Sequence, residues 1–322
     1  MCTSLYIGLV GEEPHLLFGR NMDIEAHFNE AVTVTPRNYP FAFRCRSSLS
    51  EHYAIVGMAA VAEDYPLYAD AMNEKGLCMA GLHFPHNAVY APPCGFTKEE
   101  HRLAPFELIP YLLGTCATVA EVKKALGDVA ISDLHFSHDL LNTPLHWHAA
   151  AADGALIIEA TADGLHLYDD HVGVLTNNPP YPYHTAHLHR YDNLRADFPL
   201  VPHREGGTPL GDTYDLGLGM VGLPGDYTSP SRFVRCATLR RLTEWANLSR
   251  KGAVAQFFCV LEAVAPPVGC VKTPKGEVHA TLYTCCMDTE SLVYHLRRAE
   301  APDTVSVVLT EELCLGEKLK RI

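Results

Sequence analysis

Short apolar runs separated by turn-forming residues fill the first quarter of the chain. Residues 2–10 and 15–23 flank a turn at residues 11–14 and predict a β-hairpin. Their apolar residues often follow one another directly, as in strands that are buried on both faces. The same pattern predicts further strands at residues 31–35, 53–61, 68–72 and 77–84.

The pattern then changes to helices and back to strands. Residues 105–113 can begin a helix on Pro105, and Thr118 with Glu121 forms the capping box of a second helix. This order predicts an α+β fold with sheets and helices in layers, rather than alternating βα units. The later segments are strands at residues 146–152, 155–160, 165–169 and 173–176, helices at 231–248 and 253–263, and a last hairpin at 279–287 and 292–297.

Composition narrows the class of protein. The 322 residues are 48% hydrophobic and 20% charged, which is typical of a soluble globular chain, and we expect one domain over residues 2–322. Lys and Arg total 25 against 38 Asp and Glu, a net charge of −13. This balance argues against nucleic acid or an anionic membrane as a partner.

The cysteines and the N-terminal segment suggest a compartment. Eleven cysteines are scattered without the spacing of a disulfide framework, so we expect reduced thiols. No apolar stretch approaches the ~20 residues of a membrane span, and Gly, Glu and Pro interrupt residues 8–14 where a signal peptide would be apolar. These features predict a cytoplasmic protein.

Cys2 directly follows the initiator methionine. Removal of Met1 would place a thiol and a free α-amine on one residue. An α-amine titrates at a pKa of roughly 7.7–8.0, close to what a general base needs at neutral pH. Nucleophile and base could therefore share one residue, as in N-terminal threonine enzymes. A cysteine at position 2 is also compatible with an ordinary chain start.

Two charged residues lie on the strand that should pair with the one carrying Cys2. In Phe18-Gly19-Arg20-Asn21-Met22-Asp23, Arg20 could lower the pKa of a nearby thiol, and Asp23 could hold the α-amine. Strict alternation places Arg20 and Asp23 on opposite faces of the strand, so both reach Cys2 only if the strand bends or ends there. A surface ion pair is the alternative.

Two further segments carry suitable chemistry. Asn177, in Thr176-Asn177-Asn178-Pro179, could donate to an oxyanion, although Asn-Pro is also a common turn. Arg232 begins a predicted helix and could be a second cation near the thiol or a solvated first-turn arginine. The six residues from Gly217 to Gly222 match GxGxxG, but Pro224 prevents the helix that a dinucleotide site requires.

Eighteen histidines raise the possibility of a metal site. His184, His187 and His189 fall near helical spacing on a polar stretch, without an HExxH motif or a Cys-x-x-Cys pair to support them. We interpret them as a solvated helix face. We expect neither metal nor cofactor.

Six motifs follow one another along nearly the whole chain. They are Met1-Cys2-Thr3, Phe18-Gly19-Arg20-Asn21-Met22-Asp23, Ala71-Met72-Asn73-Glu74-Lys75-Gly76-Leu77, Ala80-Gly81-Leu82, Leu175-Thr176-Asn177-Asn178-Pro179, and residues 222–226 with Ser231-Arg232-Phe233. Together they resemble the choloylglycine hydrolases, a family of bile salt hydrolases and penicillin V acylases. The resemblance implies an N-terminal nucleophile hydrolase with a four-layer αββα sandwich.

The resemblance also implies a role for each matched residue. Cys2 would be the nucleophile after loss of Met1, with its own amine as the base. Arg20 would lie beside the thiol, Asp23 would orient the amine, and Arg232 would complete the polar cluster. Asn177 would donate to the oxyanion through its side chain. The resemblance further suggests a homotetramer.

His83 departs from the family pattern, which usually has Asn or Tyr at this position. Its backbone N–H would be the second oxyanion donor, a role that survives a change of side chain. The pocket wall, and so the choice of substrate, becomes the open question. An imidazole there could titrate in the working pH range or simply fill space.

Hydrolysis of glycine- or taurine-conjugated bile acids is the predicted function. Met22, Tyr65 and Tyr68 are the predicted substrate-binding residues, since they would suit an apolar steroid pocket. Penicillin V acylase activity is the alternative within the family. Outside it remain a Cys–His hydrolase that uses an internal cysteine such as Cys78, and a metal- or ligand-binding protein without enzyme activity.

Overall fold

The computed structural model describes residues 1–9, 15–93, 101–197 and 216–322. The predicted turn at residues 11–14 lies outside these ranges. Two large antiparallel sheets form the centre of the molecule. The first has the strand order β12-β1-β2-β13-β14-β15, and the second β11-β10-β9-β6-β5-β4-β3-β16.

The first sheet contains the N-terminal hairpin that the sequence predicts. Residues of β1 and β2 pair antiparallel, with Cys2 opposite Met22 and Leu9 opposite His15. On its outer face α4 and α5 pack against β1, β2, β12 and β13. The bounds are β1 Cys2–Leu9, β2 His15–Ile24, β12 Val174–Leu175, β13 Ala280–Asp288, β14 Val293–Arg298, β15 Ala301–Val308, α4 Ser229–Leu242 and α5 Arg250–Glu262.

The second sheet carries α1 and α2 on its outer face, in contact with β4, β5, β6, β9 and β10. Thr118 accepts a hydrogen bond from the Glu121 backbone N–H at 3.1 Å and so caps α2, but the Glu121 carboxylate accepts from the Ala117 N–H and not from that of Thr118, so only half of the predicted capping box forms. The bounds are β3 Glu30–Thr35, β4 Ile55–Ala62, β5 Tyr65–Asn73, β6 Cys78–His83, β9 Leu145–Ala151, β10 Gly154–Thr161, β11 Gly164–Asp169, β16 Lys320–Arg321, α1 Leu108–Thr115 and α2 Val119–Leu126.

The remaining described elements are short. A two-stranded parallel pair, β7 and β8, lies beside α1 and α2, and α3 contacts α4. Among the described residues no helix is long and apolar enough to cross a membrane. The bounds are β7 Arg102–Leu103, β8 Ala130–Ile131, α3 Tyr181–Leu188, α6 Glu311–Cys314, and the 3₁₀ turns η1 Pro105–Glu107, η2 His189–Tyr191, η3 Leu218–Met220 and η4 Trp245–Asn247.

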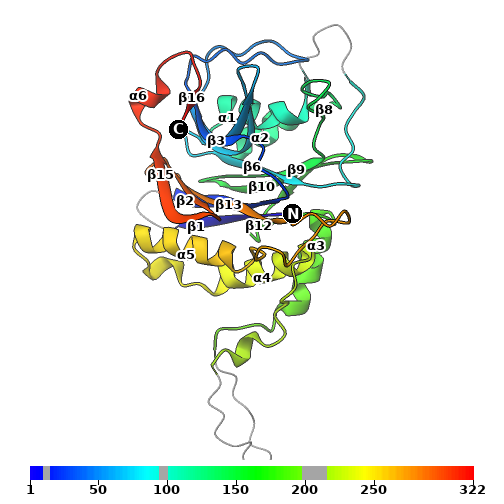
Figure 1. Cartoon of the computed structure of the whole chain (residues 1–322), viewed down its shortest axis with the longest axis vertical. Coiled ribbons are helices and arrows are strands. Elements are labelled where there is room, and N and C mark those ends of the chain that lie inside the picture. Colours follow the sequence, from blue (N-terminus) through cyan, green and yellow to red (C-terminus); the bar gives the residue numbers. More distant parts are fainter. Residues whose placement is uncertain (10–14, 94–100, 198–215) are drawn as a thin grey trace, which may run out of the picture.

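The four layers α1/α2, second sheet, first sheet and α4/α5 follow one another in Figure 1. The predicted αββα sandwich is therefore confirmed. One apolar core cluster fills the space around the first sheet and between the sheets, and a second lies between the second sheet and α1/α2. The strands β4, β5 and β6 are buried over most of their length because both of their faces are covered.

One expectation about the cysteines is wrong. Cys45 is disulfide-bonded, so the thiols are not all reduced. Cys2 and Cys78 are free and buried. Spacing could not reveal this bond, because a single disulfide in a long chain leaves no regular pattern of cysteines.

Candidate active site

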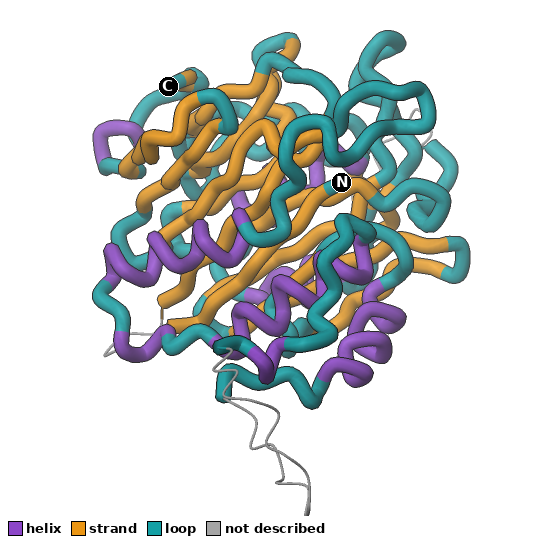
Figure 2. The backbone as a smooth tube through the Cα atoms, turned by 60° about the horizontal axis from the view of Figure 1, so that its bottom comes forward, coloured by secondary structure: helices purple, strands orange, loops and turns teal. Residues whose placement is uncertain are grey.

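Cys2 is the first residue of β1 and is only 4% exposed. Figure 2 shows the N-terminus at the end of the strands, surrounded by loops. The backbone N–H of Cys2 donates to Asn177 Oδ1 at 2.8 Å, and its carbonyl accepts from Arg232 Nη1 at 2.6 Å. Residues that are more than 170 positions apart in the sequence thus meet at Cys2.

Strand alternation explains how Arg20 and Asp23 both reach this residue. Arg20 points toward the second sheet, where its Nη1 donates to Gly81 O at 2.7 Å. Its neighbour Asn21 points the other way and donates to Leu261 O on α5. Alternation along β2 places Asp23 on the same face as Asn21, opposite Arg20, and Cys2 ends the paired strand beside Met22, between the two.

Arg20 is fully buried between the sheets. Its Nη1 also donates to Ala69 O at 3.3 Å, while its Nη2 has no hydrogen-bond partner in the described part of the chain. Burial alone would lower the pKa of Arg20, but Cys2, Tyr283 and Asp70 together raise it. The guanidinium therefore stays charged, and Cys2 is one of the groups that its charge faces.

Asp23 has one carboxylate oxygen to spare. Its Oδ1 accepts from Thr281 Oγ1 at 2.6 Å, whereas the buried Oδ2 lacks a hydrogen-bond partner among the described residues. In the chain that retains Met1, Cys2 N is an amide with one proton, which Asn177 already accepts. A free α-amine at Cys2 would bring additional protons to this side, and Asp23 Oδ2 is suited to receive one.

The side chain of Asn177 is held in one orientation. Its Oδ1 accepts from both Cys2 N and Arg232 Nη2, the latter at 2.7 Å, and its Nδ2 donates to His83 O at 2.7 Å. The amide nitrogen carries two protons, so one remains for an incoming oxygen. Arg232 also donates to Thr3 Oγ1 at 2.6 Å. Burial lowers the pKa of Arg232, while Asp23 and Cys2 act in the opposite direction.

His83 is the last residue of β6, and its side chain is exposed. Neighbouring groups still cover part of the ring, and this desolvation, followed by the chain's terminal amine, lowers the pKa of His83. It borders the site without being part of the Cys2 hydrogen-bond network, and its backbone carbonyl is the group that Asn177 contacts.

Two buried histidines that the sequence did not single out as site residues hold the Asn177 segment. His184 on α3 donates from Nε2 to Asn177 O at 2.8 Å, and burial lowers its pKa to about 4. It is fully buried, so its interpretation as part of a solvated helix face is wrong. His146 on β9 donates from Nε2 to Thr176 O at 3.1 Å. Neither contact has a signal in the sequence, because both join a histidine to a backbone carbonyl.

The predicted substrate-binding residues separate into two groups. Met22 is 8% exposed and belongs to the same core cluster as Cys2. Tyr65 and Tyr68 belong to the other cluster, with α1 and α2. Tyr68 Oη contacts Thr35 Oγ1 at 2.8 Å. The structure does not bring these two tyrosines together with Cys2.

The alternative of an internal nucleophile at Cys78 loses support. Cys78 is fully buried in β6, and desolvation raises the pKa of its thiol well above the usual value. A thiolate is the reactive form of cysteine. Cys2, which lies beside two guanidinium groups, has the more suitable surroundings.

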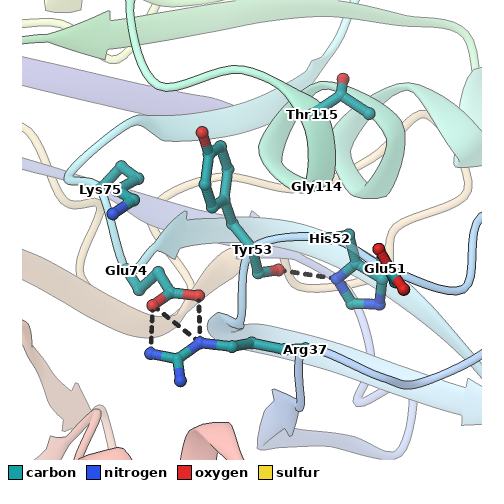
Figure 3. A pocket seen from close by; sticks show the side chains of 8 residues that line it. All are labelled: Arg37, Glu51, His52, Tyr53, Glu74, Lys75, Gly114 and Thr115. Carbon is teal, nitrogen blue, oxygen red and sulfur yellow. Dashed lines mark hydrogen bonds and ion pairs between the residues drawn. The ribbon is translucent and has the colours of Figure 1, made fainter.

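A pocket of about 570 Å³ lies elsewhere on the molecule (Figure 3). Its lining includes Arg37 together with Glu74 and Lys75, and the latter two lie just before the start of β6. His83, in contrast, is the last residue of β6. The pocket is therefore at the opposite end of the sheet from the Cys2 site. Arg37 is paired with Glu74 and with Glu311, so its charge is already balanced.

Known proteins that resemble this chain share its whole length. Residues 2–317 match the family model of linear amide C–N hydrolases, choloylglycine hydrolase family. The chain is 42% identical over 312 residues to a bile salt hydrolase/transferase of Lactiplantibacillus plantarum, covering 97% of this chain and 93% of that protein. It is 35% identical over 326 residues to a bile salt hydrolase/transferase of Clostridium perfringens, covering 99% and 96% respectively.

Solved structures agree with this assignment. A conjugated bile acid hydrolase from Clostridium perfringens matches with a TM-score of 0.88 and 33% identity, over 100% of this chain and 96% of that one. A penicillin V acylase from Agrobacterium tumefaciens has the same fold, with a TM-score of 0.75 at 21% identity over 100% and 90% of the two chains. The chain is a member of the choloylglycine hydrolase family of linear amide C–N hydrolases.

Proposed function

We propose that this enzyme hydrolyses the amide bond that joins a bile acid to glycine or taurine. The observation that carries the proposal is the buried cluster in which Asn177 and Arg232 contact the backbone of Cys2. The choice of a bile acid as the substrate is supported by two relatives that are named bile salt hydrolase/transferase. This chain matches both of them over almost their full length.

In the first step, Cys2 attacks the substrate carbonyl after Met1 has been removed. The α-amine of Cys2 takes the thiol proton, and the Cys2 sulfur bonds to the carbonyl carbon. The remaining proton of Asn177 Nδ2 and the backbone N–H of His83 stabilise the oxyanion. The charged Arg20 lies beside Cys2, and Asp23 Oδ2 orients the ammonium.

In the second step, the ammonium returns its proton to the substrate nitrogen. The C–N bond breaks, an amine leaves, and the acyl group remains on sulfur as a thioester.

In the third step, water attacks the thioester, and the amine of Cys2 accepts one of the water protons. The free acid leaves as the thiol re-forms. No part of this scheme uses a metal or cofactor. An amine that attacks in place of water would give acyl transfer.

Substrate choice is tested by one assay with glycocholate, taurocholate and penicillin V side by side. We expect the highest kcat/KM for a conjugated bile acid. A more than tenfold preference for penicillin V, about 1.4 kcal/mol in transition-state binding, would favour the acylase that shares the fold.

We also propose that the enzyme is a cytoplasmic homotetramer. The family resemblance of the motifs supports this state. Sedimentation equilibrium should give four times the mass of the chain, and a concentration-independent monomer would contradict it. Cell fractionation, with a cytoplasmic marker as the control, tests the compartment.

A further inference from the structure

The backbone of Met1 occupies a defined polar site next to Cys2. Its amine donates to Asp23 O at 2.9 Å and contacts His279 Nε2, and its carbonyl accepts from Asp23 N at 3.2 Å. Three polar atoms of the enzyme thus bind the amino and carbonyl groups of one amino acid. Removal of Met1 leaves all three atoms without this partner.

The tautomer of His279 suits it to bind an amine. His279 Nδ1 lies 2.9 Å from Glu25 Oε1. A carboxylate only accepts hydrogen bonds, so Nδ1 carries the proton and Nε2 is left as an acceptor. His279 is 8% exposed, and its backbone N–H donates to Val271 O at 3.0 Å, so the ring is held in place.

Charged groups of both signs lie around this site. Burial lowers the pKa of the Met1 amine, whereas the nearby charges of Asp23 and Glu25 favour its charged form. Once Met1 is absent, the α-ammonium of Cys2 lies where the Met1 carbonyl carbon was attached. The two acceptors, Asp23 O and His279 Nε2, then suit the amine of glycine or taurine. The nearby ammonium of Cys2 suits the carboxylate or sulfonate. His83 borders the same place, since its electrostatic neighbours are the terminal amine, Glu25 and His279.

We propose that the position vacated by Met1 is the subsite for the amino-acid half of the substrate, with His279 as its amine-binding residue. His279 Nε2 accepts the single hydrogen bond that the amide nitrogen of the substrate can donate, Asp23 O accepts a second one only from the free amine, and Asp23 N–H donates to the carboxylate or sulfonate. This inference rests on the proposed bile acid amidase function. It adds that the same subsite holds an incoming amino acid when the thioester is attacked by an amine.

The transfer step is balanced without another reactant. The uncharged amine of glycine attacks the thioester carbon, a new C–N bond forms, and the C–S bond breaks. The thiolate leaves, and the proton lost by the nitrogen goes to the α-amine of Cys2. His279 holds the attacking nitrogen, so its loss should weaken glycine binding without affecting attack by water.

The test compares water and glycine as acceptors of one acyl group. A p-nitrophenyl ester of cholic acid acylates Cys2 without an amino-acid half, and increasing glycine then competes with water. We measure glycocholate formed against cholate released. For His279→Ala we expect the glycine concentration that gives half-maximal transfer to rise about tenfold, the effect of one lost hydrogen bond. Ester hydrolysis by the same variant is measured alongside, so that the ratio of glycocholate to cholate separates weaker glycine binding from a general loss of activity.

Two variants serve as comparisons for His279→Ala. His279→Gln keeps an acceptor oxygen and should recover part of the transfer. Glu25→Ala changes an exposed residue, removes the group that fixes the His279 tautomer, and should shift transfer in the same direction by a smaller factor. His189→Ala is the matched control, because His189 pairs with Asp192 at 3.2 Å on the exposed η2 turn.

Three results would overturn the subsite. An unchanged transfer ratio in His279→Ala and Glu25→Ala would show that His279 does not bind the amine. An equal loss of ester hydrolysis and transfer would show a structural role only. No transfer by the unaltered enzyme at any glycine concentration would show that the site does not accept an amino acid. Failure to cleave any conjugated bile acid, with ester hydrolysis intact, would instead contradict the proposed function.

Discussion

At the scale of single residues, the site is organised around the nitrogen of Cys2 as much as around its sulfur. Asn177 binds this nitrogen, Arg232 fixes Asn177, and Asp23, whose Oδ2 has no partner among the described residues, accepts from the terminal amine through its backbone carbonyl. These contacts suit a residue whose amine acts as the base. A thiol that depended on a separate histidine would need an imidazole in this network.

Asp23→Asn tests the role of the carboxylate. Loss of the anion disfavours the ammonium form, so the pKa of the α-amine should fall. The acidic limb of the pH profile of kcat/KM should therefore move to lower pH. We expect kcat/KM at pH 7 to fall about 10- to 100-fold, as for a lost hydrogen bond between charged groups. An unchanged profile would exclude contact between Asp23 and the base.

Sequence patterns predicted part of this residue-level picture. Alternation correctly placed Arg20 and Asp23 on opposite faces, but it could not show that Cys2 ends its strand between them. His184 and His146 were missed because they contact backbone carbonyls, which any residue possesses. Tyr65 and Tyr68 were chosen for their apolar character, which fits a core as well as a pocket.

At the scale of elements, His146 on β9 connects the two segments that carry the proposed oxyanion donors. It donates to Thr176 O, next to Asn177, and its ring stacks on Phe84, next to His83, at 4.2 Å between centroids. Its Nδ1 lies 3.0 Å from Glu159 Oε1. All of these side chains are fully buried, so the ends of β6 and β12 are held in register by one imidazole.

His146→Phe keeps an aromatic ring against Phe84 and removes both hydrogen bonds. We expect kcat for a conjugated bile acid to fall about tenfold, a modest share of the full effect of an oxyanion donor, with KM within twofold. Steady-state kinetics and thermal unfolding should be measured together.

His148→Phe is the matched control on the same strand. His148 lies 2.8 Å from Ser4 Oγ and 3.0 Å from Asp170 Oδ2, and all three residues are buried at the contact between the sheets. This group resembles a catalytic triad but has no access to substrate, so its loss should lower stability and leave kcat nearly unchanged. Equal falls in kcat for both variants would remove the positioning role of His146.

At the scale of the whole molecule, the sequence predicted the layers of helices and sheets better than it predicted the order of strands within each sheet. Runs of apolar residues and helix caps located most strands and helices, because these signals are local. The strand β15 was missed, since Pro302 stands near its start and most of its described residues are exposed. The order of strands within each sheet depends on contacts distant in sequence, such as that of β2 with β13. The family resemblance implied the four layers in advance, but it did not supply this order of strands.

Glu30 links the two sheets and gives the fold a measurable pH dependence. From β3 it accepts hydrogen bonds from Arg298 Nη1 on β14 at 2.9 Å and from the Phe28 backbone N–H at 3.0 Å. Burial alone would raise the pKa of Glu30, but hydrogen bonds from His27, the backbone and Arg298 lower it to about 2. The stability that Glu30 contributes is present above its ordinary pKa of 4.5 and is lost as pH falls towards 2.

Glu30→Gln should lower the free energy of unfolding at pH 7 by about 1–3 kcal/mol, and the difference from the unaltered protein should shrink between pH 4.5 and pH 3. Urea unfolding across this range measures both. A difference that is independent of pH would show that the charge of Glu30 contributes nothing.

The proposed mechanism depends on one covalent event, the acylation of Cys2 after Met1 has been removed. Intact-mass spectrometry of the enzyme mixed with glycocholate and quenched in acid observes it directly. We predict a protein that lacks Met1 and carries a cholyl group on the peptide that begins with Cys2, with no such group on Cys2→Ala. Turnover by a protein that retains Met1, or a cholyl group on any other residue, would contradict the account.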